Sequence, residues 1–408
     1  MRVGLYYPWI YLTSGAERVI LELSGRSRHE WTLFTSHFAP AQTFPGFAER
    51  KVVELDRVPV DRSIGAVARA AAKVMQLRLP LEELDALVVV CEGVGDLVTF
   101  RNHRIPSLCI CLTPLRLVFD PEYRERTRNG RGPLARLAVA AGSLAFREID
   151  RRAWRHYRRI FCISEEAKRR ASAGRLASDD RMEVLHVGLG VDSAQPSDIF
   201  EPFFLIAGRM MWTKNIQLGI EAFRQLLRTT PAAKNFRLVI AGIVDKKSEP
   251  YLEQLRAHAE GLPVEFRVFP NDAELKELYR TCYGLLFTAF NEDWGIVPLE
   301  AMAFGKPVVA VNRGGPRETV VSGVNGFLAE PVAEEFASAM ADLVNHPDEA
   351  RRIGARGYEH SRRYSWSKFT ERIDEAIDAL RVARDGASES LPVGQKLGSA
   401  VEIARNEG

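Results

Sequence analysis

Cysteine is scarce in this chain. The five that occur among 408 residues are Cys91, Cys109, Cys111, Cys162 and Cys282. An odd number at low density, mostly within apolar runs, does not fit a disulfide framework and favours buried free thiols in a reducing compartment. Cys109 and Cys111 fall in one strand-like run. We expect them to point to opposite sides of the strand and therefore predict no metal site there.

Long hydrophobic runs are also lacking. No stretch reaches the ~18 apolar residues that a membrane-spanning helix needs, and the start M-R-V-G-L-Y-Y-P leads directly into a strand pattern without a secretory leader. The net charge of +3 is too small to mark the whole chain as a binder of polyanions. We therefore expect a cytoplasmic protein, with the inner face of the membrane as an alternative location, and no nucleic-acid partner.

Strand-like and helix-like segments alternate along most of the chain, and its length fits two domains of roughly 150–200 residues. This alternation predicts an α/β fold of two doubly wound, Rossmann-like domains facing each other across a cleft. The predicted strands of the first domain are Val3–Tyr7, Trp31–Thr35, Leu87–Cys91, Ser107–Leu112 and Arg159–Ile163. Those of the second are Phe203–Ala207, Phe236–Ala241, Val264–Phe269, Gly284–Phe287 and Pro307–Val311.

The pattern resets at a polar segment, V-D-S-A-Q-P-S-D, which reads as a linker. We place the first domain at 1–195 and the second at 196–370. A helix over 371–384 follows. The tail 385–408 is rich in Ser, Gly and Glu and lacks periodicity, so we expect it to be disordered.

The segment N-E-D-W-G-I-V-P-L-E-A-M-A-F-G-K-P-V-V-A, which begins at Asn291, carries the strongest chemical signal. A strand ends just before it, and Pro298 suits the first turn of a helix over 298–304. The free N–H groups of such a helix N-terminus bind phosphate, and Gly295, Ile296 and Val297 would supply them. Glu292 and Glu300 flank these donors and could accept hydrogen bonds from sugar hydroxyls. The residues alone leave open that both are ordinary surface acids.

This segment, followed by G-G-P-R-E-T-V and G-V-N-G-F, resembles the E-x7-E donor site of retaining GT-B glycosyltransferases, in particular the mannosyltransferase-like branch of family 4. The resemblance implies that Glu292 contacts hydroxyls of the donor sugar and that Glu300 contacts the ribose. It extends over roughly residues 1–370. It also implies that base recognition uses backbone near Val268–Pro270.

The string G-R-M-M-W-T-K-N resembles a second element of this family, in which the cations bind the donor diphosphate. Arg209 and Lys214 would then stabilise the charge that grows on the leaving group, beside Asn215. Without the resemblance, Arg209 and Lys214 would be interpreted as surface cations. The chain contains no D-x-D triplet, the usual metal-binding sequence of the other main nucleotide-sugar fold. We therefore expect no metal and no cofactor.

Two first-domain elements complete the resemblance. The string T-S-G-A-E-R resembles the family's glycine-rich loop, so Gly15 would let the backbone approach the diphosphate. The string C-L-T-P-L-R resembles the family's H-T-P-x-R loop and assigns Thr113 and Arg116 to the acceptor side. Leu112 stands where the family has a histidine. A different substrate, a substitute residue or a loss of activity would each explain that change.

Residues 115–159 contain many arginines interleaved with apolar side chains, among them Leu134, Leu137 and Leu144. This region could rest on an anionic membrane and present a lipid-linked acceptor, or it could be a solvated helix face with acidic partners.

The sequence thus favours a retaining, metal-independent enzyme that moves a hexose from a nucleotide-diphosphate sugar to a glycan or lipid-linked acceptor. GDP-mannose is the first expectation for the donor, and a UDP-sugar is an alternative. A noncatalytic sugar-nucleotide-binding subunit of a glycan assembly complex stays open because of Leu112. An oxidoreductase is disfavoured because no G-x-G-x-x-G follows the first strand.

Overall fold

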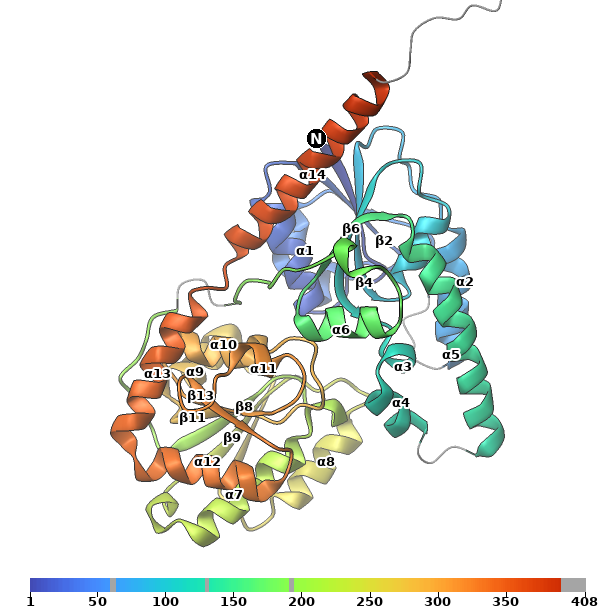
Figure 1. Cartoon of the computed structure of the whole chain (residues 1–408). Coiled ribbons are helices and arrows are strands. Elements are labelled where there is room, and N and C mark those ends of the chain that lie inside the picture. The colour runs from blue at the N-terminus through green and yellow to red at the C-terminus, as the bar shows by residue number, and fades with distance from the viewer. Residues whose placement is uncertain (59–63, 129–131, 191–193, 390–408) are drawn as a thin grey trace, which may run out of the picture.

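The computed structural model describes residues 1–58, 64–128, 132–190 and 194–389, which form two α/β units built on separate sheets (Figure 1). Every strand pair in both sheets is parallel, and the apolar strands are buried between layers of helices. The strand orders are β3-β2-β1-β4-β5-β6-β7 and β10-β9-β8-β11-β12-β13. The predicted fold class is therefore confirmed.

The strand order reverses in the same way in both sheets. The first strand of each unit, β1 or β8, lies in the middle, and the chain continues to one side before it crosses to the other. In such sheets the crevice at the carboxyl ends of the strands, next to the reversal, is the usual place for ligands. The first sheet contains β1 (Arg2–Tyr6), β2 (Glu30–Thr35), β3 (Val52–Glu54), β4 (Ala86–Gly93), β5 (Ser107–Pro114), β6 (Tyr157–Cys162) and β7 (Met182–Val184). The second contains β8 (Phe203–Ala207), β9 (Arg237–Gly242), β10 (Val264–Val268), β11 (Gly284–Phe287), β12 (Val308–Val311) and β13 (Gly326–Ala329).

Helices connect the strands and cover the sheets. Those before β8 are α1 (Gly15–Arg26), α2 (Ile64–Gln76), α3 (Arg116–Phe119), α4 (Pro121–Arg128), α5 (Pro133–Trp154) and α6 (Glu165–Ala173). Those after β8 are α7 (Ile216–Thr229), α8 (Glu249–His258), α9 (Asp272–Thr281), α10 (Ile296–Ala303), α11 (Pro316–Thr319), α12 (Ala333–Asn345), α13 (Pro347–Ser361) and α14 (Trp366–Glu389). None of the described helices combines the length and the apolar character needed to cross a membrane.

All ten predicted strands occur, with ends shifted by two residues at most. The sequence analysis missed β3, β7 and β13, which contain three or four residues each and lie at or next to the sheet edges. Such short edge strands bury too few apolar side chains to give a clear pattern. The first three residues of the predicted linker, 191–193, lie outside the described residues.

The last helix returns from the second unit to the first. In Figure 1, α14 runs upward beside α1. Asp374 accepts hydrogen bonds from the Ser27 hydroxyl (2.6 Å) and the Arg28 N–H (3.0 Å). The helix starts before the predicted 371–384 and continues through 385–389, which we expected in the disordered tail; 390–408 lie outside the described residues.

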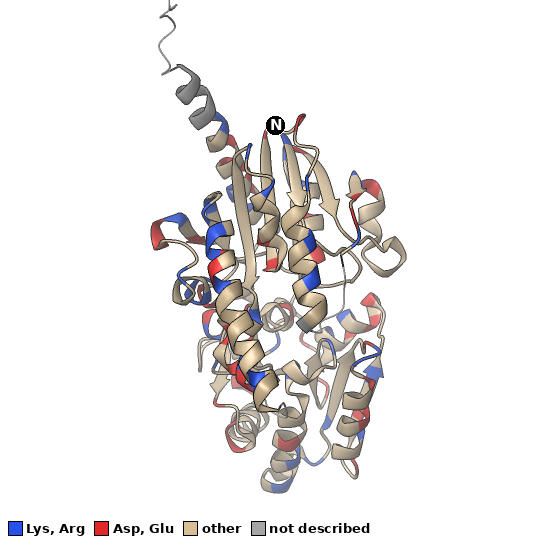
Figure 2. Ribbon diagram, turned by 90° about the vertical axis from the view of Figure 1, so that its right-hand side faces the viewer, with Lys and Arg blue, Asp and Glu red and all other residues tan. Residues whose placement is uncertain are grey.

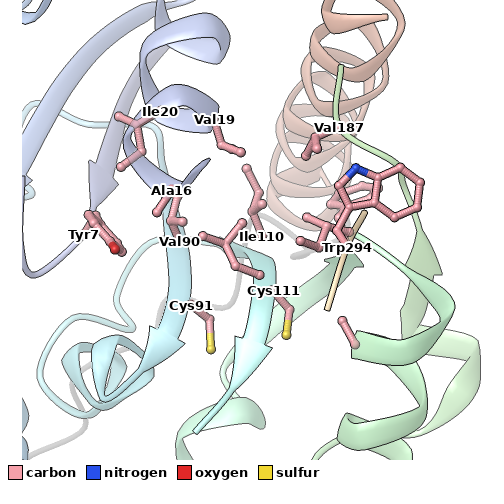
Figure 3. Packing of buried hydrophobic residues seen from close by; sticks show 14 of the residues in the cluster. Tyr7, Ala16, Val19, Ile20, Val90, Cys91, Ile110, Cys111, Val187 and Trp294 are labelled. Atoms are coloured by element: carbon pink, nitrogen blue, oxygen red, sulfur yellow. The ribbon is translucent and has the colours of Figure 1, made fainter. Parts of the chain in front are cut away.

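The expected orientation of Cys109 and Cys111 is wrong. Residues two apart on a strand share a face, and Cys91 on the neighbouring strand β4 lies opposite Cys111 in the register. Figure 3 shows the sulfur atoms of Cys91 and Cys111 side by side on adjacent strands. All five cysteines are buried and free, as expected.

The hydrophobic core continues across the junction of the two units. Ala16 and Val19 of α1 face Val90 and Ile110 of the first sheet, and Trp294 of the second unit belongs to the same cluster (Figure 3). Trp366 closes this cluster at the start of α14: it is buried, and its indole N–H donates to the carbonyl of Leu189 at 2.6 Å.

Replacing this indole should weaken the whole molecule. We expect Trp366→Ala to lower the stability to urea by about 3–5 kcal/mol, because it opens a large cavity and leaves the Leu189 carbonyl without its donor. The matched control, Leu134→Ala, removes a side chain that is 82% exposed and should change stability by less than about 0.5 kcal/mol. Equal urea midpoints for the two variants would contradict a joint core.

Candidate functional site

A cavity of about 320 Å³ lies between the carboxyl ends of the two sheets and is lined by both units. The second unit contributes Arg209, Lys214, Glu292 and Asp293. The first contributes Tyr7, Trp9, Tyr11, Ser14, Glu17, Glu92, Thr113 and Arg116, among others. Of the predicted site residues, the cavity thus brings together Arg209, Lys214, Glu292, Thr113 and Arg116. Gly15, Asn215, Gly295, Ile296, Val297 and Glu300 are not among its lining residues.

Lys214 and Glu292 form the central ion pair of the cavity, with 2.6 Å between Nζ and Oε2. Burial alone would favour the neutral carboxyl, but Lys214, aided by Arg116 and Arg209, outweighs it and holds the pKa of Glu292 below its usual value. Arg209 forms no salt bridge with any described residue. The site therefore carries one unneutralised cation beside a paired one, which suits an anionic ligand.

Backbone contacts fix the loop that carries Lys214. The Thr288 hydroxyl donates to the Lys214 carbonyl at 2.8 Å, and the N–H of Phe290 donates to the carbonyl of Thr213 at 2.8 Å. Asn215 ends this turn in the left-handed region (φ 47°) and caps α7. The two predicted elements, which are ~75 residues apart, are thus joined at the ends of β8 and β11.

Glycines allow the loop around Glu292 to pack closely. A Cβ on Gly314 (φ +64°) would lie 2.4 Å from the carbonyl oxygen of Glu292, and that carbonyl accepts the N–H of Gly315 at 2.8 Å. Asn291 next to it also has positive φ (40°). Positive φ at a residue other than glycine costs free energy and persists only where the surroundings impose it. The position of Glu292 is therefore imposed by its neighbours.

Arg170 on α6 of the first unit holds the same loop from across the cleft. It is 1% exposed, donates to the carbonyl of Asn291 at 2.7 Å and pairs with Asp293. In its own unit it contacts Glu166 (2.9 Å) and Asp120 (3.4 Å). A buried guanidinium with this many partners is costly to displace, so the loop that carries Glu292 is fixed to the first unit.

Arg116 supports the loop from a second direction. Its guanidinium donates to the carbonyl of Asn291 at 3.0 Å and to Asp120 at 2.9 Å. Burial by itself would lower the pKa of Arg116, but Asp293, Glu292 and Asp120 outweigh it and raise that pKa. Arg116 was predicted on the acceptor side; in the structure it faces the loop of the opposite unit while lining the cavity.

A further carboxylate joins the units at the start of α6. Glu318 of the second unit accepts the N–H groups of Glu165 (2.9 Å) and Glu166 (3.1 Å), the first residues of that helix. It also contacts His186 at 3.1 Å. An acidic group at a helix N-terminus is stabilised by the helix dipole and by free N–H donors. Helix α6 is thus anchored to the second unit at its start and through Arg170.

Helix α10 begins two residues earlier than predicted, at Ile296, with Gly295 as its N-cap and Pro298 still in the first turn. The N–H groups of Ile296 and Val297 make no backbone hydrogen bond within the described residues. They are the donors that the phosphate prediction requires, although they lie beside the cavity rather than on its lining.

Glu300 lies one turn into α10. It accepts the Tyr279 hydroxyl at 2.8 Å, and a Cβ on Gly190 would lie 2.7 Å from its other oxygen. Burial raises the pKa of Glu300 despite the Tyr279 hydrogen bond. The ribose contact assigned to Glu300 stays a prediction.

Gly15 is the first residue of α1, and a Cβ there would meet no atom within 4 Å. Open space at this position agrees with the predicted approach of a ligand. Ser14 before it donates to Glu17, which is buried and also accepts the N–H of Leu12 at 3.1 Å. Burial raises the pKa of Glu17.

Leu112 is buried in the core of the first unit and does not line the cavity. The pairing of β4 with β5 explains this: Cys91 pairs with Cys111 but Glu92 pairs with Thr113, so Leu112 is the extra residue of a β-bulge. Beyond the bulge, Glu92 and Thr113 both face the cavity.

Several lining residues were not predicted, notably Tyr7, Glu17, Glu92 and Asp293. The tyrosine hydroxyl donates to Glu92 at 2.7 Å. An acid directly after a buried strand, as in the run V-V-V-C-E-G, was a usable signal for Glu92. Asp293 adjoins Glu292, but its partner Arg170 is 123 residues away in the chain and gave no local signal.

One group in the described part of the chain gathers three side chains that could ligate a metal: Cys91, Asp96 and Cys109. It lies in the core and outside the cavity lining. The Asp96 oxygens already accept Cys91 (2.6 Å) and Tyr157 (2.6 Å), and burial raises the pKa of this carboxyl. These contacts describe a satisfied hydrogen-bond network rather than an open ligand set.

Solved structures share this architecture over nearly the whole chain. Anabaena Alr3699/HepE, crystallised with UDP and glucose, matches with a TM-score of 0.69 at 20% identity and covers 93% of this chain and 100% of its own. WaaG, a glycosyltransferase involved in lipopolysaccharide biosynthesis, matches with a TM-score of 0.64 at 16% identity, covering 92% and 99%. The two facing doubly wound units define the GT-B fold of glycosyltransferases.

Sequence comparison finds a family model and curated relatives that resemble part of the chain. Residues 194–360 match the model for "Glycosyl transferases group 1". The matched residues form the second unit, so this unit is similar to group 1 glycosyltransferases. Similar curated proteins are the alpha-1,3/1,6-mannosyltransferases ALG2 of Dictyostelium discoideum (31% identical; 44% of this chain, 46% of that protein) and alg-2 of Neurospora crassa (32%; 55% and 56%). The chain spans about half the length of these relatives.

The packing of the Glu292 loop on Gly314 can be tested by stability. We expect Gly314→Ala to lower the unfolding free energy by about 2–4 kcal/mol, because a methyl group there adds a backbone clash to the cost of positive φ. Gly323→Ala is the matched control: its φ is +75° and its Cβ would meet nothing within 4 Å. It should cost about 1 kcal/mol. Similar losses in urea unfolding would show that the loop is not packed as described.

Proposed function

We propose that the protein is a retaining, metal-independent mannosyltransferase that moves mannose from GDP-mannose to a glycan or lipid-linked acceptor. The observation that carries this proposal is the convergence of Arg209, Lys214 and Glu292 on one cavity between the two units. The names of the related mannosyltransferases support mannose as the sugar. The UDP and glucose in the HepE structure keep a UDP-sugar as the alternative donor.

In this proposal the donor diphosphate lies between Arg209 and the N-terminus of α10. Arg209 has no salt bridge among the described residues, so it can bind a phosphate without losing one. Lys214 shares its charge between the diphosphate and Glu292. Glu292 then has a free oxygen for a sugar hydroxyl. Ion pairing keeps its pKa low, so it is a charged acceptor near neutral pH.

The reaction needs no protein nucleophile. The bond between the anomeric carbon and the departing phosphate oxygen breaks, and the acceptor oxygen bonds to that carbon from the same face. The acceptor proton passes to the departing phosphate. Arg209, Lys214 and the α10 donors stabilise the charge that develops on the nucleoside diphosphate, which is the role that a metal would otherwise fill.

Base recognition is proposed at the end of β10. Phe269 is 64% exposed and has φ of 56°, and its N–H donates to the carbonyl of Gly242 at 2.9 Å. A bulky residue held in this region of φ is strained, and such strain concentrates at functional sites.

The buried position of Leu112 bears on the noncatalytic alternative. That alternative rested on a contact missing from the cleft, yet the side chain at this position packs in the core. Its identity therefore removes no group from the cavity lining, and we favour turnover.

The decisive experiment measures binding and slow hydrolysis of GDP-, UDP-, ADP- and TDP-sugars by the full chain, with and without a chelator. We expect selective binding of GDP-mannose, chelator-insensitive release of GDP and, by NMR of the transfer product, retention at the anomeric carbon. Inversion or a chelator-sensitive rate would contradict the mechanism. Binding without release, even with acceptor extracts, would favour the noncatalytic subunit.

Lys214→Ala sharpens this experiment. Removing the ammonium should weaken GDP binding by about tenfold or more while guanosine binding changes little, because only the diphosphate interacts with it. Equal losses for both ligands in calorimetry would argue against diphosphate contact. Lys234→Ala, an exposed lysine beyond α7, is the matched control.

We also propose that the protein works in the cytoplasm at the inner face of an anionic membrane, through α5. Leu134, Leu137 and Leu144 are 82%, 67% and 66% exposed, and their spacing places them on one side of the helix. Figure 2 shows that the N-terminal part of α5 has few charges, whereas its C-terminal part carries both basic and acidic residues. Arg131 and the side chain of Arg128 lie outside the described residues.

The arginines of this region do not all face solvent. Arg151 donates to the carbonyl of Gly174 at 2.9 Å, and Arg126 stacks on Phe290 at 3.4 Å. The leucines therefore carry more of the proposed contact than the sequence analysis assumed.

A triple variant tests this surface. Leu134→Glu, Leu137→Glu and Leu144→Glu together should lower cosedimentation with phosphatidylglycerol-containing vesicles by about tenfold or more, because apolar burial is replaced by repulsion. The control places three glutamates at exposed valines of the second unit: Val321, Val324 and Val332. Unchanged sedimentation of the leucine variant, or equal loss in both, would contradict the assignment.

A further inference from the structure

Both walls of the cavity carry charged side chains of both signs, since Glu292 and Asp293 lie on the second unit and Arg116 lies on the first. The cations Arg209 and Lys214 come from the second unit. The first unit contributes two carboxylates, Glu17 and Glu92, together with aromatic side chains of the loop after β1. The two acids differ in what they can still bind.

Glu17 is occupied by its own loop. One oxygen accepts the N–H of Leu12 at 3.1 Å, and the other accepts the hydroxyl of Ser14. It is 1% exposed. These contacts fix the loop between β1 and α1 and leave Glu17 little capacity for a ligand.

Glu92 is only half occupied. Its Oε2 accepts the hydroxyl of Tyr7 at 2.7 Å, while its Oε1 has no partner among the described residues. Tyr7 is 4% exposed, and burial, together with Glu92, raises the pKa of its phenol, so the phenol keeps its proton and donates. The carboxylate is thus held from behind, with one oxygen available to the cavity.

The backbone aims Glu92 into the cavity. The register shift between β4 and β5 falls at Cys91 and Glu92, and Gly93 turns the chain away from the sheet with φ of +95°. Bulges of this kind occur next to active sites, where they redirect a side chain. A carboxylate that served only to satisfy Tyr7 would not need this half-buried position on the cavity wall.

We propose that Glu92 is the acceptor-binding carboxylate: its free oxygen accepts a hydrogen bond from a hydroxyl of a neutral sugar ring that stacks on the aromatic side chains of the same wall. Tyr7 is the positioning residue that orients it. The carboxylate of Glu92 disfavours an acceptor ring that bears a carboxylate or phosphate. The inference rests on the proposed transfer reaction and adds the chemical class of the acceptor.

The test uses the full chain, the donor selected by the nucleotide-sugar panel, and octyl glycosides as acceptors: mannoside, glucoside, N-acetylglucosaminide and the anionic glucuronide. We expect transfer to at least one neutral glycoside and little to the glucuronide. In Glu92→Gln the ratio of transfer to donor hydrolysis should fall about tenfold or more, since a charge-assisted hydrogen bond to the acceptor is weakened. Glu83→Gln, at a side chain that is 83% exposed, is the matched control.

Tyr7→Phe separates positioning from folding. Tyr7→Phe keeps the ring, and it should lower the ratio of transfer to hydrolysis by a smaller factor and raise the KM for the glycoside. Glu92→Asp keeps the carboxylate, so its ratio should lie between those of Glu92→Gln and the wild type. Equal falls of transfer and hydrolysis, an unchanged ratio, a preference for the glucuronide, or donor hydrolysis without transfer to any neutral glycoside would each overturn the inference. A wild-type protein that neither binds nor hydrolyses any donor would instead refute the proposed function.

Discussion

The buried guanidinium of Arg170 is the contact on which the site depends. Taking an arginine out of water costs several kcal/mol unless its donors are satisfied. Here the partners come from both units: Glu166 and Asp120 on one side, the Asn291 carbonyl and Asp293 on the other. Removing either unit would leave a buried charge unpaired. The loop with Glu292 is therefore positioned by the domain arrangement, and the cleft geometry and the donor site are one structural feature.

Parallel-sheet topology explains why so few residues suffice to build the cavity. In both sheets the strand order reverses beside the first strand of the unit. The loops after β1, β4 and β5 therefore face those after β8 and β11. Close backbone packing completes the geometry. At Gly242, a Cβ would lie 1.8 Å from the carbonyl oxygen of Gly208, directly before Arg209. Helix α14 adds a second connection between the units, because it leaves α13 and packs on α1.

The side chains of the cavity suit the two substrates of the proposed transfer. The wall that would hold the nucleoside diphosphate supplies Arg209 and Lys214, with the N-terminus of α10 beside it, and the opposite wall supplies Glu92 and aromatic rings. In the proposed reaction an acceptor hydroxyl keeps its proton until the phosphate departs, and Glu92 would orient that hydroxyl without removing the proton. The similarity of residues 194–360 to group 1 glycosyltransferases and the composition of the cavity are independent observations, and both agree with this proposal.

The sequence by itself determined the fold class and ten strands, and it singled out three second-unit residues that line the cavity. Buried parallel strands have continuous apolar runs, and Arg209, Lys214 and Glu292 lie in two compact segments whose spacing is set locally. Tertiary structure decided the rest. The pairing of β4 with β5 shifts by one residue, which places Leu112 in the core and Glu92 at the cavity. No local sequence pattern predicts this shift. Arg170 meets Asp293 only because the units close on each other, since contacts over 123 residues depend on packing and not on neighbouring sequence.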